Sequence, residues 1–145
     1  MKTEFAFTQL KDPHFLLAVL LGPVVWVVLW LFVRGAGGSL TLLWLINGVL
    51  LYPLLEELAF RGFLQGWLLE RERMRRQFVG ITLANVITSA LFAMAHLINQ
   101  PPLWAASVVF PSLVFGYFRD RHQSIVPSFL LHAWYNAGFF LVVYG

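Results

Sequence analysis

The chain contains no cysteine. This absence excludes disulfide bonds, cysteine nucleophiles and cysteine-based metal sites, although it says nothing about the redox compartment. Charged residues are also scarce: they make up 12% of the 145 residues, whereas a soluble domain carries about 25%. Hydrophobic residues make up 59%. The composition therefore predicts an integral membrane protein, and the length predicts a single domain over residues 1–145.

Asp, Glu, Lys and Arg are absent from four long segments, which are Pro13–Val33, Gly35–Leu55, Gln77–Phe118 and Gln123–Gly145. A helix needs about 20 apolar residues to cross the hydrocarbon core of a bilayer, so the third segment has room for two. No segment shows the period-two alternation of a membrane barrel, which leaves helices to satisfy the backbone. The sequence predicts an all-α, polytopic bundle of about five transmembrane helices, at approximately 14–33, 40–69, 79–98, 103–118 and 124–144.

Cationic residues between the predicted spans indicate the orientation of the bundle. If the N-terminus is inside, most of these cations lie on the inner side: Lys2, Lys11, Arg71, Arg73, Arg75, Arg76, Arg119 and Arg121. Only Arg34 lies outside. We therefore expect an N-in, C-out, multi-pass protein whose basic loops face anionic cytoplasmic lipid. The net charge of +3 does not indicate nucleic-acid binding, because no basic face with interleaved aromatic residues lies outside the loops.

The first predicted span is expected to stay in the protein. It lacks a small-residue cleavage site of the Ala-x-Ala type, and its apolar run is too long for the core of a signal peptide. The chain also contains no internal repeat, low-complexity tract or linker.

Six strong polar side chains interrupt the apolar spans: Glu56, Glu57 and Arg61 in the second, His96 in the third, and His132 and Asn136 in the fifth. A charge inside a membrane span costs roughly 2.5–3.5 kcal/mol on insertion scales, so a span that keeps three is expected to use them. Residues four apart share a helix face, which lets Glu57 pair with Arg61. This spacing favours Glu56 as the carboxylate that faces a cavity, with Glu57 as the alternative.

These residue types supply the chemistry for hydrolysing an amide bond. A carboxylate and a neutral imidazole can polarise a water molecule, with the carboxylate taking its proton. A second imidazole and an amide N–H can donate hydrogen bonds to the developing oxyanion. A covalent intermediate is not required, and none of the serines lies in a nucleophile-elbow sequence.

Each polar group also has a purely structural interpretation. Glu57 and Arg61 can form a structural ion pair, and His96, His132 and Asn136 can be interhelical hydrogen bonders. A non-catalytic scaffold needs only these roles, but it does not need all six groups together. A proton-coupled transporter that uses Glu56 and the histidines as a relay is another alternative, although five helices without an internal repeat disfavour it.

Three patterns occur in order along the chain: Glu-Glu-x-x-x-Arg at 56–61, Phe-x-x-x-His at 92–96 and His-x-x-x-Asn at 132–136. Together they resemble the CAAX-processing and bacteriocin-processing intramembrane protease family, over roughly residues 45–140. The segment from Glu56 to Gln65 is similar to the first motif of that family. Its members usually carry more helices, so this chain resembles a minimal version.

The resemblance implies a glutamic-type endopeptidase that cuts a lipid-anchored or membrane-tethered substrate, in CAAX-type or C-terminal sorting-tail processing, in a bacterial or archaeal inner membrane. By the same resemblance, Glu56 is the general base and His96 holds the same water. His132 and Asn136 form the oxyanion hole, and Glu57 and Arg61 support the site. A non-catalytic scaffold or a bacteriocin-immunity-type binding protein of the same fold is the alternative.

The family is often described as metalloproteases, so a metal site must be considered. The sequence has no His-Glu-x-x-His, and Asn136 is a poor zinc ligand, so no cofactor is expected. A zinc site formed by Glu56, His96 and His132 remains the alternative.

Overall fold

The structure, a computed structural model, describes residues 11–35 and 37–145. Lys2, which contributes to the predicted orientation, lies outside the described residues. The described chain is mostly helical, as predicted, and it also contains one short hairpin. It forms two compact units, one combining the chain up to Leu55 with Phe129–Gly145 and the other comprising Glu56–Ser128. Each unit is described below by itself.

Three helices of the described residues are long and apolar enough to cross a membrane: Pro13–Val33, Leu42–Leu69 and Val126–Tyr144. They coincide with the first, second and fifth predicted spans. A shorter apolar helix, Leu83–His96, occupies the third predicted span. The chain is therefore an integral membrane protein, while the count of five spans and the N-in orientation stay predictions.

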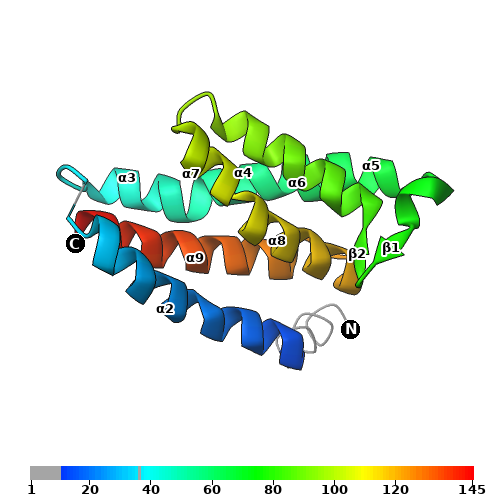
Figure 1. Cartoon of the computed structure of the whole chain (residues 1–145), viewed down its shortest axis with the longest axis horizontal. Helices are drawn as coiled ribbons and strands as arrows, with labels where there is room; N and C mark the ends of the chain where they lie inside the picture. The colour runs from blue at the N-terminus through cyan, green and yellow to red at the C-terminus, as the bar shows by residue number, and fades with distance from the viewer. Residues whose placement is uncertain (1–10, 36) are drawn as a thin grey trace. The chain divides into compact units, whose positions relative to one another are not determined.

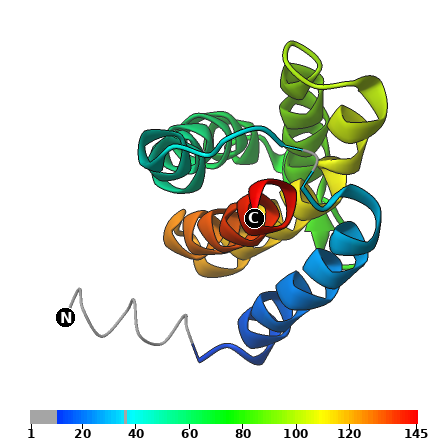
Figure 2. The ribbon, with the colours of Figure 1, turned by 90° about the vertical axis from the view of Figure 1, so that its left-hand side faces the viewer.

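In the first unit, helix α2 (Pro13–Val33) packs on α9 (Val126–Tyr144), as Figures 1 and 2 show. Asp12 caps α2, because its side chain accepts a hydrogen bond from the backbone N–H of His14. The Trp134 indole donates to the carbonyl of Val19 at 3.0 Å, and the Tyr135 hydroxyl donates to that of Ala18 at 2.8 Å. These bonds fix the register of α9 against α2.

The second predicted span is one continuous helix, in which two stretches widen into π-helix. Its segments are α3 (Leu42–Ile46), the π-helix η1 (Asn47–Leu51), α4 (Tyr52–Glu57), the π-helix η2 (Leu58–Gln65) and α5 (Gly66–Leu69). Such π-helical stretches are rare and frequently lie at functional sites. Here η2 begins directly after the pair of glutamates. The 3-10 helix η3 (Glu72–Arg75) follows.

The second unit continues with a hairpin and three helices: β1 (Gln77–Phe78), β2 (Ile81–Thr82), α6 (Leu83–His96), α7 (Pro102–Ser107) and α8 (Val109–His122). The prediction of helix from residue 79 is wrong, because Val79 and Gly80 have φ of +50° and +78°. Positive φ at both central residues makes a two-residue hairpin turn, which a helix cannot contain. Figures 1 and 2 show α6 beside α8.

The predicted break at residues 119–122 is also wrong, because α8 continues to His122. Its last turn carries Arg119, Arg121 and His122, and cations stabilise the negative C-terminal end of a helix dipole. The helix ends at Gln123, which has a left-handed φ of +51°. A second difference is that the fourth predicted span, 103–118, consists of α7 and α8, which meet at Val108.

Candidate active site

Glu57 and Arg61 form an ion pair inside the second unit. The Arg61 Nε lies 3.3 Å from the Glu57 Oε2, and both side chains have an exposed fraction of 0%. Their four-residue spacing puts them one turn apart on the same face of the long helix. If the two side chains separated, each would be a buried charge without a counter-charge, which is strongly destabilising. The two side chains are therefore expected to stay in contact.

Arg61 is also bound to α8 and enclosed by aromatic rings. Its Nη2 donates to the Ser112 hydroxyl at 2.6 Å and to the Ser112 carbonyl at 3.0 Å. The guanidinium carbon lies 4.6 Å from the centre of the Phe92 ring and 5.6 Å from that of Phe115. Ring faces attract cations, more strongly where water is excluded. The arginine therefore joins the long helix to both α6 and α8.

Glu57 and Arg61 begin a line of buried polar contacts, here called the polar seam, between the long helix and α8. Gln65, one further turn along the same face of the long helix, continues it. The Gln65 amide donates to the carbonyl of Gly116 at 3.0 Å and to the carboxylate of Asp120 at 2.8 Å. The partners on α8 are thus Ser112, Gly116 and Asp120, which are also spaced by four. The polar residues of the long helix and their partners on α8 thus share a spacing of four, so one face of each helix contacts the other along the polar seam.

Helix α6 joins the seam through Asn85 and through Thr82, the last residue of β2 and the N-cap of α6. Thr82 donates to Asp120 at 2.6 Å, and the Asn85 amide donates to the carbonyl of Leu113 at 2.9 Å. A Cβ on Gly116 would lie 2.0 Å from the Asn85 Oδ1, so only glycine allows this approach. Small residues permit such close contact between membrane helices.

Sequence reasoning missed these supporting residues, which are Gln65, Thr82, Asn85, Ser112, Gly116 and Asp120. A signal for them exists in the chain: 57, 61 and 65 have the same spacing as 112, 116 and 120. That match identifies a pair only when the two helices are known to be neighbours.

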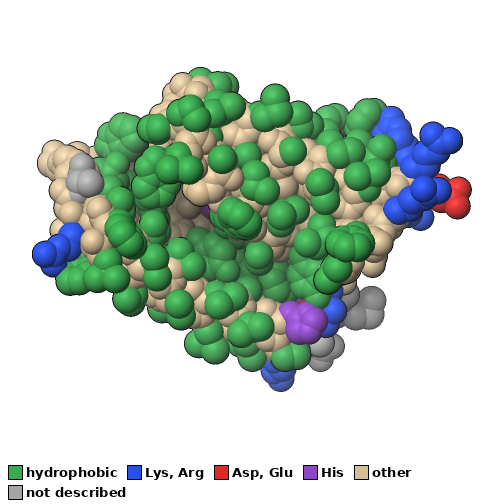
Figure 3. Space-filling model, in the orientation of Figure 1, with side chains coloured by type: hydrophobic (Ala, Val, Ile, Leu, Met, Phe, Trp, Pro, Cys, Tyr) green, Lys and Arg blue, Asp and Glu red, His purple; other side chains and the backbone are tan. Residues whose placement is uncertain are grey.

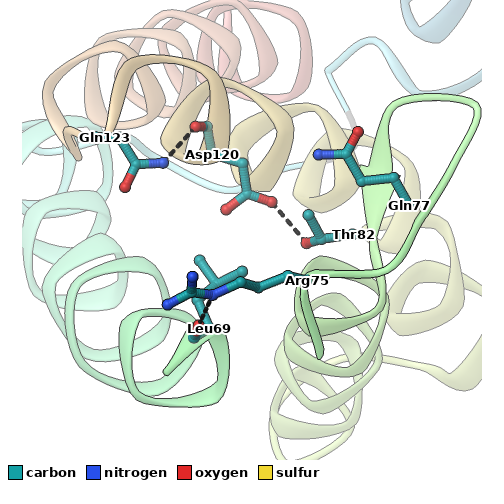
Figure 4. A pocket seen from close by; sticks show the side chains of 6 residues that line it. All are labelled: Leu69, Arg75, Gln77, Thr82, Asp120 and Gln123. Atoms are coloured by element: carbon teal, nitrogen blue, oxygen red, sulfur yellow. Dashed lines mark hydrogen bonds between the residues drawn. The ribbon is translucent and has the colours of Figure 1, made fainter. Parts of the chain in front are cut away.

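Asp120 lies at the end of the seam, beside a cavity of about 310 Å³. Figure 4 shows Thr82 pointing at its carboxylate, with Arg75, Gln77 and Gln123 around the opening. Burial raises the pKa of Asp120. The hydrogen bonds from Thr82 and Gln65 and the charge of Arg119 lower the pKa, but the effect of burial is larger. None of the predicted catalytic residues lines this cavity.

Glu56 differs from its neighbour in exposure. It is partly exposed, whereas Glu57 is fully buried against Arg61. Of the two carboxylates, Glu56 is therefore the one that is not enclosed by the protein. A general base must contact the water that it activates, and this difference favours Glu56 for that role.

His96 is the last residue of α6 and is also partly exposed. Its Nδ1 lies 2.9 Å from the carbonyl oxygen of Phe92, and its ring lies 4.6 Å from the Phe92 ring. A carbonyl only accepts hydrogen bonds, so Nδ1 carries the proton. In the neutral imidazole, Nε2 then keeps a lone pair that can accept a hydrogen bond from water or bind a metal.

The first unit holds His132 and Asn136, one turn apart on α9. His132 is buried. The Asn136 Nδ2 donates to the carbonyl of Gly48 at 2.8 Å, which fixes its amide. An amide nitrogen has two hydrogens, so Asn136 retains a second N–H that can donate to an oxyanion. Gly48 lies against Phe140, where a Cβ would come within 2.3 Å of the ring.

The predicted site residues thus divide between the units, with Glu56, Glu57, Arg61 and His96 in the second and His132 and Asn136 in the first. Within the described residues, no group of three or more His, Asp or Glu side chains is placed to hold a metal ion.

A family model described as "Type II CAAX prenyl endopeptidase Rce1-like" matches residues 37–138. This range includes all six predicted site residues. No curated protein and no solved structure matches the chain.

Proposed function

Because the chain belongs to the Rce1-like type II CAAX prenyl endopeptidase family, we propose that it is an intramembrane endopeptidase of the glutamic type. Its substrate is a lipid-anchored or membrane-tethered protein, cut near the membrane in CAAX-type or C-terminal sorting-tail processing. The observation that carries the proposal is the contrast between Glu56, which is partly exposed, and Glu57, which is fully buried against Arg61.

The proposed reaction begins with a water molecule held by Glu56 and the Nε2 of His96. Glu56 takes a proton from this water, and the resulting hydroxide attacks the carbonyl carbon of the scissile bond. His132 and the remaining N–H of Asn136 donate hydrogen bonds to the oxyanion of the tetrahedral intermediate. The intermediate collapses, the C–N bond breaks, and the proton on Glu56 passes to the leaving amine.

The supporting groups hold the reacting ones in place. Arg61 neutralises Glu57, so that the second carboxylate does not compete for the proton, and Ser112 fixes Arg61. The Phe92 carbonyl holds His96 in the tautomer that leaves Nε2 unprotonated.

Nothing in this scheme requires a cofactor. The competing scheme places zinc on Glu56, His96 and His132, and incubation with a chelator tests it: the glutamic mechanism predicts undiminished cleavage.

The integral membrane location suits such a substrate, and we propose the inner membrane of a bacterial or archaeal cell.

The alternative function is a non-catalytic scaffold or a bacteriocin-immunity-type binding protein. A scaffold requires the buried pair of Glu57 and Arg61, but it does not require a partly exposed glutamate beside them.

The test uses Glu56→Gln and His132→Ala, made separately, with Glu70→Gln as a matched control. Glu70 is an exposed glutamate directly after the same long helix. The purified variants are incubated with a prenylated CAAX peptide and, in a second arm, with a membrane-anchored peptide that carries a C-terminal sorting tail. Cleavage is expected to fall by at least 100-fold in both site variants and to be unchanged in the control. Full cleavage by folded Glu56→Gln protein would contradict the mechanism.

A further inference from the structure

The turn between β1 and β2 has an unusual residue at its first central position. Val79 has a φ of +50°, followed by Gly80 at +78°. Turns of this type favour Asn-Gly, and a left-handed conformation is costly for a β-branched side chain. Strain of this kind persists at sites where it serves a function. The fold alone therefore gives no reason for valine at position 79.

The tip of this hairpin presents two large apolar side chains to the surroundings. The exposed fractions are 84% for Phe78 and 85% for Val79. The hairpin itself is firmly held at its base. The N–H of Leu83 donates to the carbonyl of Arg76 at 2.9 Å, and Thr82 donates to the Asp120 carboxylate at 2.6 Å. The two apolar side chains are therefore displayed by a fixed element.

Cations surround the base of the hairpin. Four exposed arginines come just before it in the chain, namely Arg71, Arg73, Arg75 and Arg76. Figure 3 shows Lys and Arg side chains gathered beside the segment that Figure 1 draws between α5 and β1. The Arg71 guanidinium carbon lies 3.6 Å from the centre of the Trp67 ring. Tryptophan is enriched at membrane interfaces, and arginines near the surface bind anionic headgroups.

We propose that the Phe78–Val79 tip inserts into the anionic leaflet of the same membrane, with the four arginines bound to its phosphate groups. Apolar side chains beside a cluster of cations are the composition of segments that lie in a membrane interface. The charge of the cluster selects an anionic lipid, and the apolar tip requires access to acyl chains. This contact anchors the loop between the long helix and α6 at a defined depth. It does not depend on the proposed protease activity.

The absence of cysteine makes the experiment direct. Phe78→Cys carries an environment-sensitive fluorophore, and Glu72→Cys, in the exposed 3-10 helix of the same loop, serves as the control. Both proteins are placed in nanodiscs of phosphatidylcholine, with or without phosphatidylglycerol. Nitroxide lipids with a shallow acyl label are expected to quench the probe at 78 at least threefold more than the probe at 72. Phosphatidylglycerol is expected to increase this difference.

Two variants separate insertion from a general loss of structure. In the Phe78→Cys background, Val79→Asn removes the apolar side chain but suits the left-handed turn better. It is expected to reduce quenching at 78 at least twofold without lowering the thermal unfolding midpoint. Replacing Arg73 and Arg76 with Gln is expected to abolish the phosphatidylglycerol effect.

Three outcomes would overturn the proposal. One is equal quenching of the two probes by aqueous iodide in both lipid mixtures. Another is an unchanged response after Val79→Asn. The third is lipid quenching at 78 that arises only when a prenylated peptide is added, which would assign the tip to substrate capture instead.

Discussion

The guanidinium of Arg61 donates two hydrogen bonds to Ser112, one to its hydroxyl at 2.6 Å and one to its carbonyl at 3.0 Å. Both residues are completely buried, and they lie 51 positions apart in the chain. With Glu57 on its other side, Arg61 is bound from two helices. This arrangement makes the arginine a fixed structural cation, whose effect on the partly exposed Glu56 is to hold its helix in place.

Ser112→Ala removes the shorter of these two bonds and leaves the carbonyl in place. We expect the free energy of unfolding to fall by about 1–3 kcal/mol, because a buried charged donor loses a partner. Thermal unfolding in detergent micelles measures the change. Ser107→Ala is the matched control: its hydroxyl donates to the carbonyl of Trp104 at an exposed position, so its effect is expected to be much smaller. Equal effects in the two variants would contradict the structural role of Ser112.

Glu57→Gln and Glu56→Gln are expected to have opposite consequences, although the residues are neighbours. Glu57→Gln leaves Arg61 buried without its counter-charge, which costs about 3–5 kcal/mol of stability. Glu56→Gln changes a partly exposed group, so it is expected to abolish cleavage while the unfolding midpoint stays within experimental error. Measuring both quantities on both variants separates the roles. If Glu56→Gln proved the less stable protein, the assignment of the two carboxylates would be reversed.

The long helices could be predicted from the sequence because their cause is local. Largely apolar segments of sufficient length must form helices in a bilayer, and three of them do so close to the predicted bounds. The hairpin could not be predicted in this way, since Val79 stands where such a turn usually has Asn, Asp or Gly before its glycine, and the pair lies in an uncharged segment. Likewise, the charges of Arg119 and Arg121 suggested a loop, but they lie in the last turn of α8.

The candidate site was only partly accessible to sequence reasoning. Glu57 and Arg61 pair within one helix, so their spacing was enough to predict the contact. Ser112 and Asn85 are ordinary small polar residues whose roles arise from the packing of α8 against its neighbours. Only the tertiary structure brings such residues to the site.

Gly116→Ala tests the close approach of α6 and α8. The new Cβ would lie 2.0 Å from the Asn85 Oδ1, and this oxygen cannot easily move because Ser89 donates to it at 3.0 Å. Overpacking of this kind costs about 1–3 kcal/mol or more. Gly62→Ala is the matched control, since its nearest neighbours would be 3.8 Å away. Because alanine is the better helix former, Gly62→Ala is expected to be neutral or stabilising by up to about 1 kcal/mol in the same unfolding assay. A stable Gly116→Ala protein would show that the two helices are further apart.

Asp120 makes stability depend on pH. Because burial raises its pKa in the folded protein, the folded state binds the proton more tightly than the unfolded state does. The stabilising contribution of the protonated carboxyl is present below the ordinary pKa of 3.8 and is lost as the pH rises through the raised value. Asp120→Asn cannot ionise, so its stability relative to the wild type is expected to increase across that window. Unfolding midpoints of both proteins, measured at matched ionic strength over an acidic pH series, give this difference and remove the contribution of other titrating groups. A wild-type protein that gained stability over Asp120→Asn as the pH rose would show instead that the hydrogen bonds from Thr82 and Gln65 outweigh the burial of the charge.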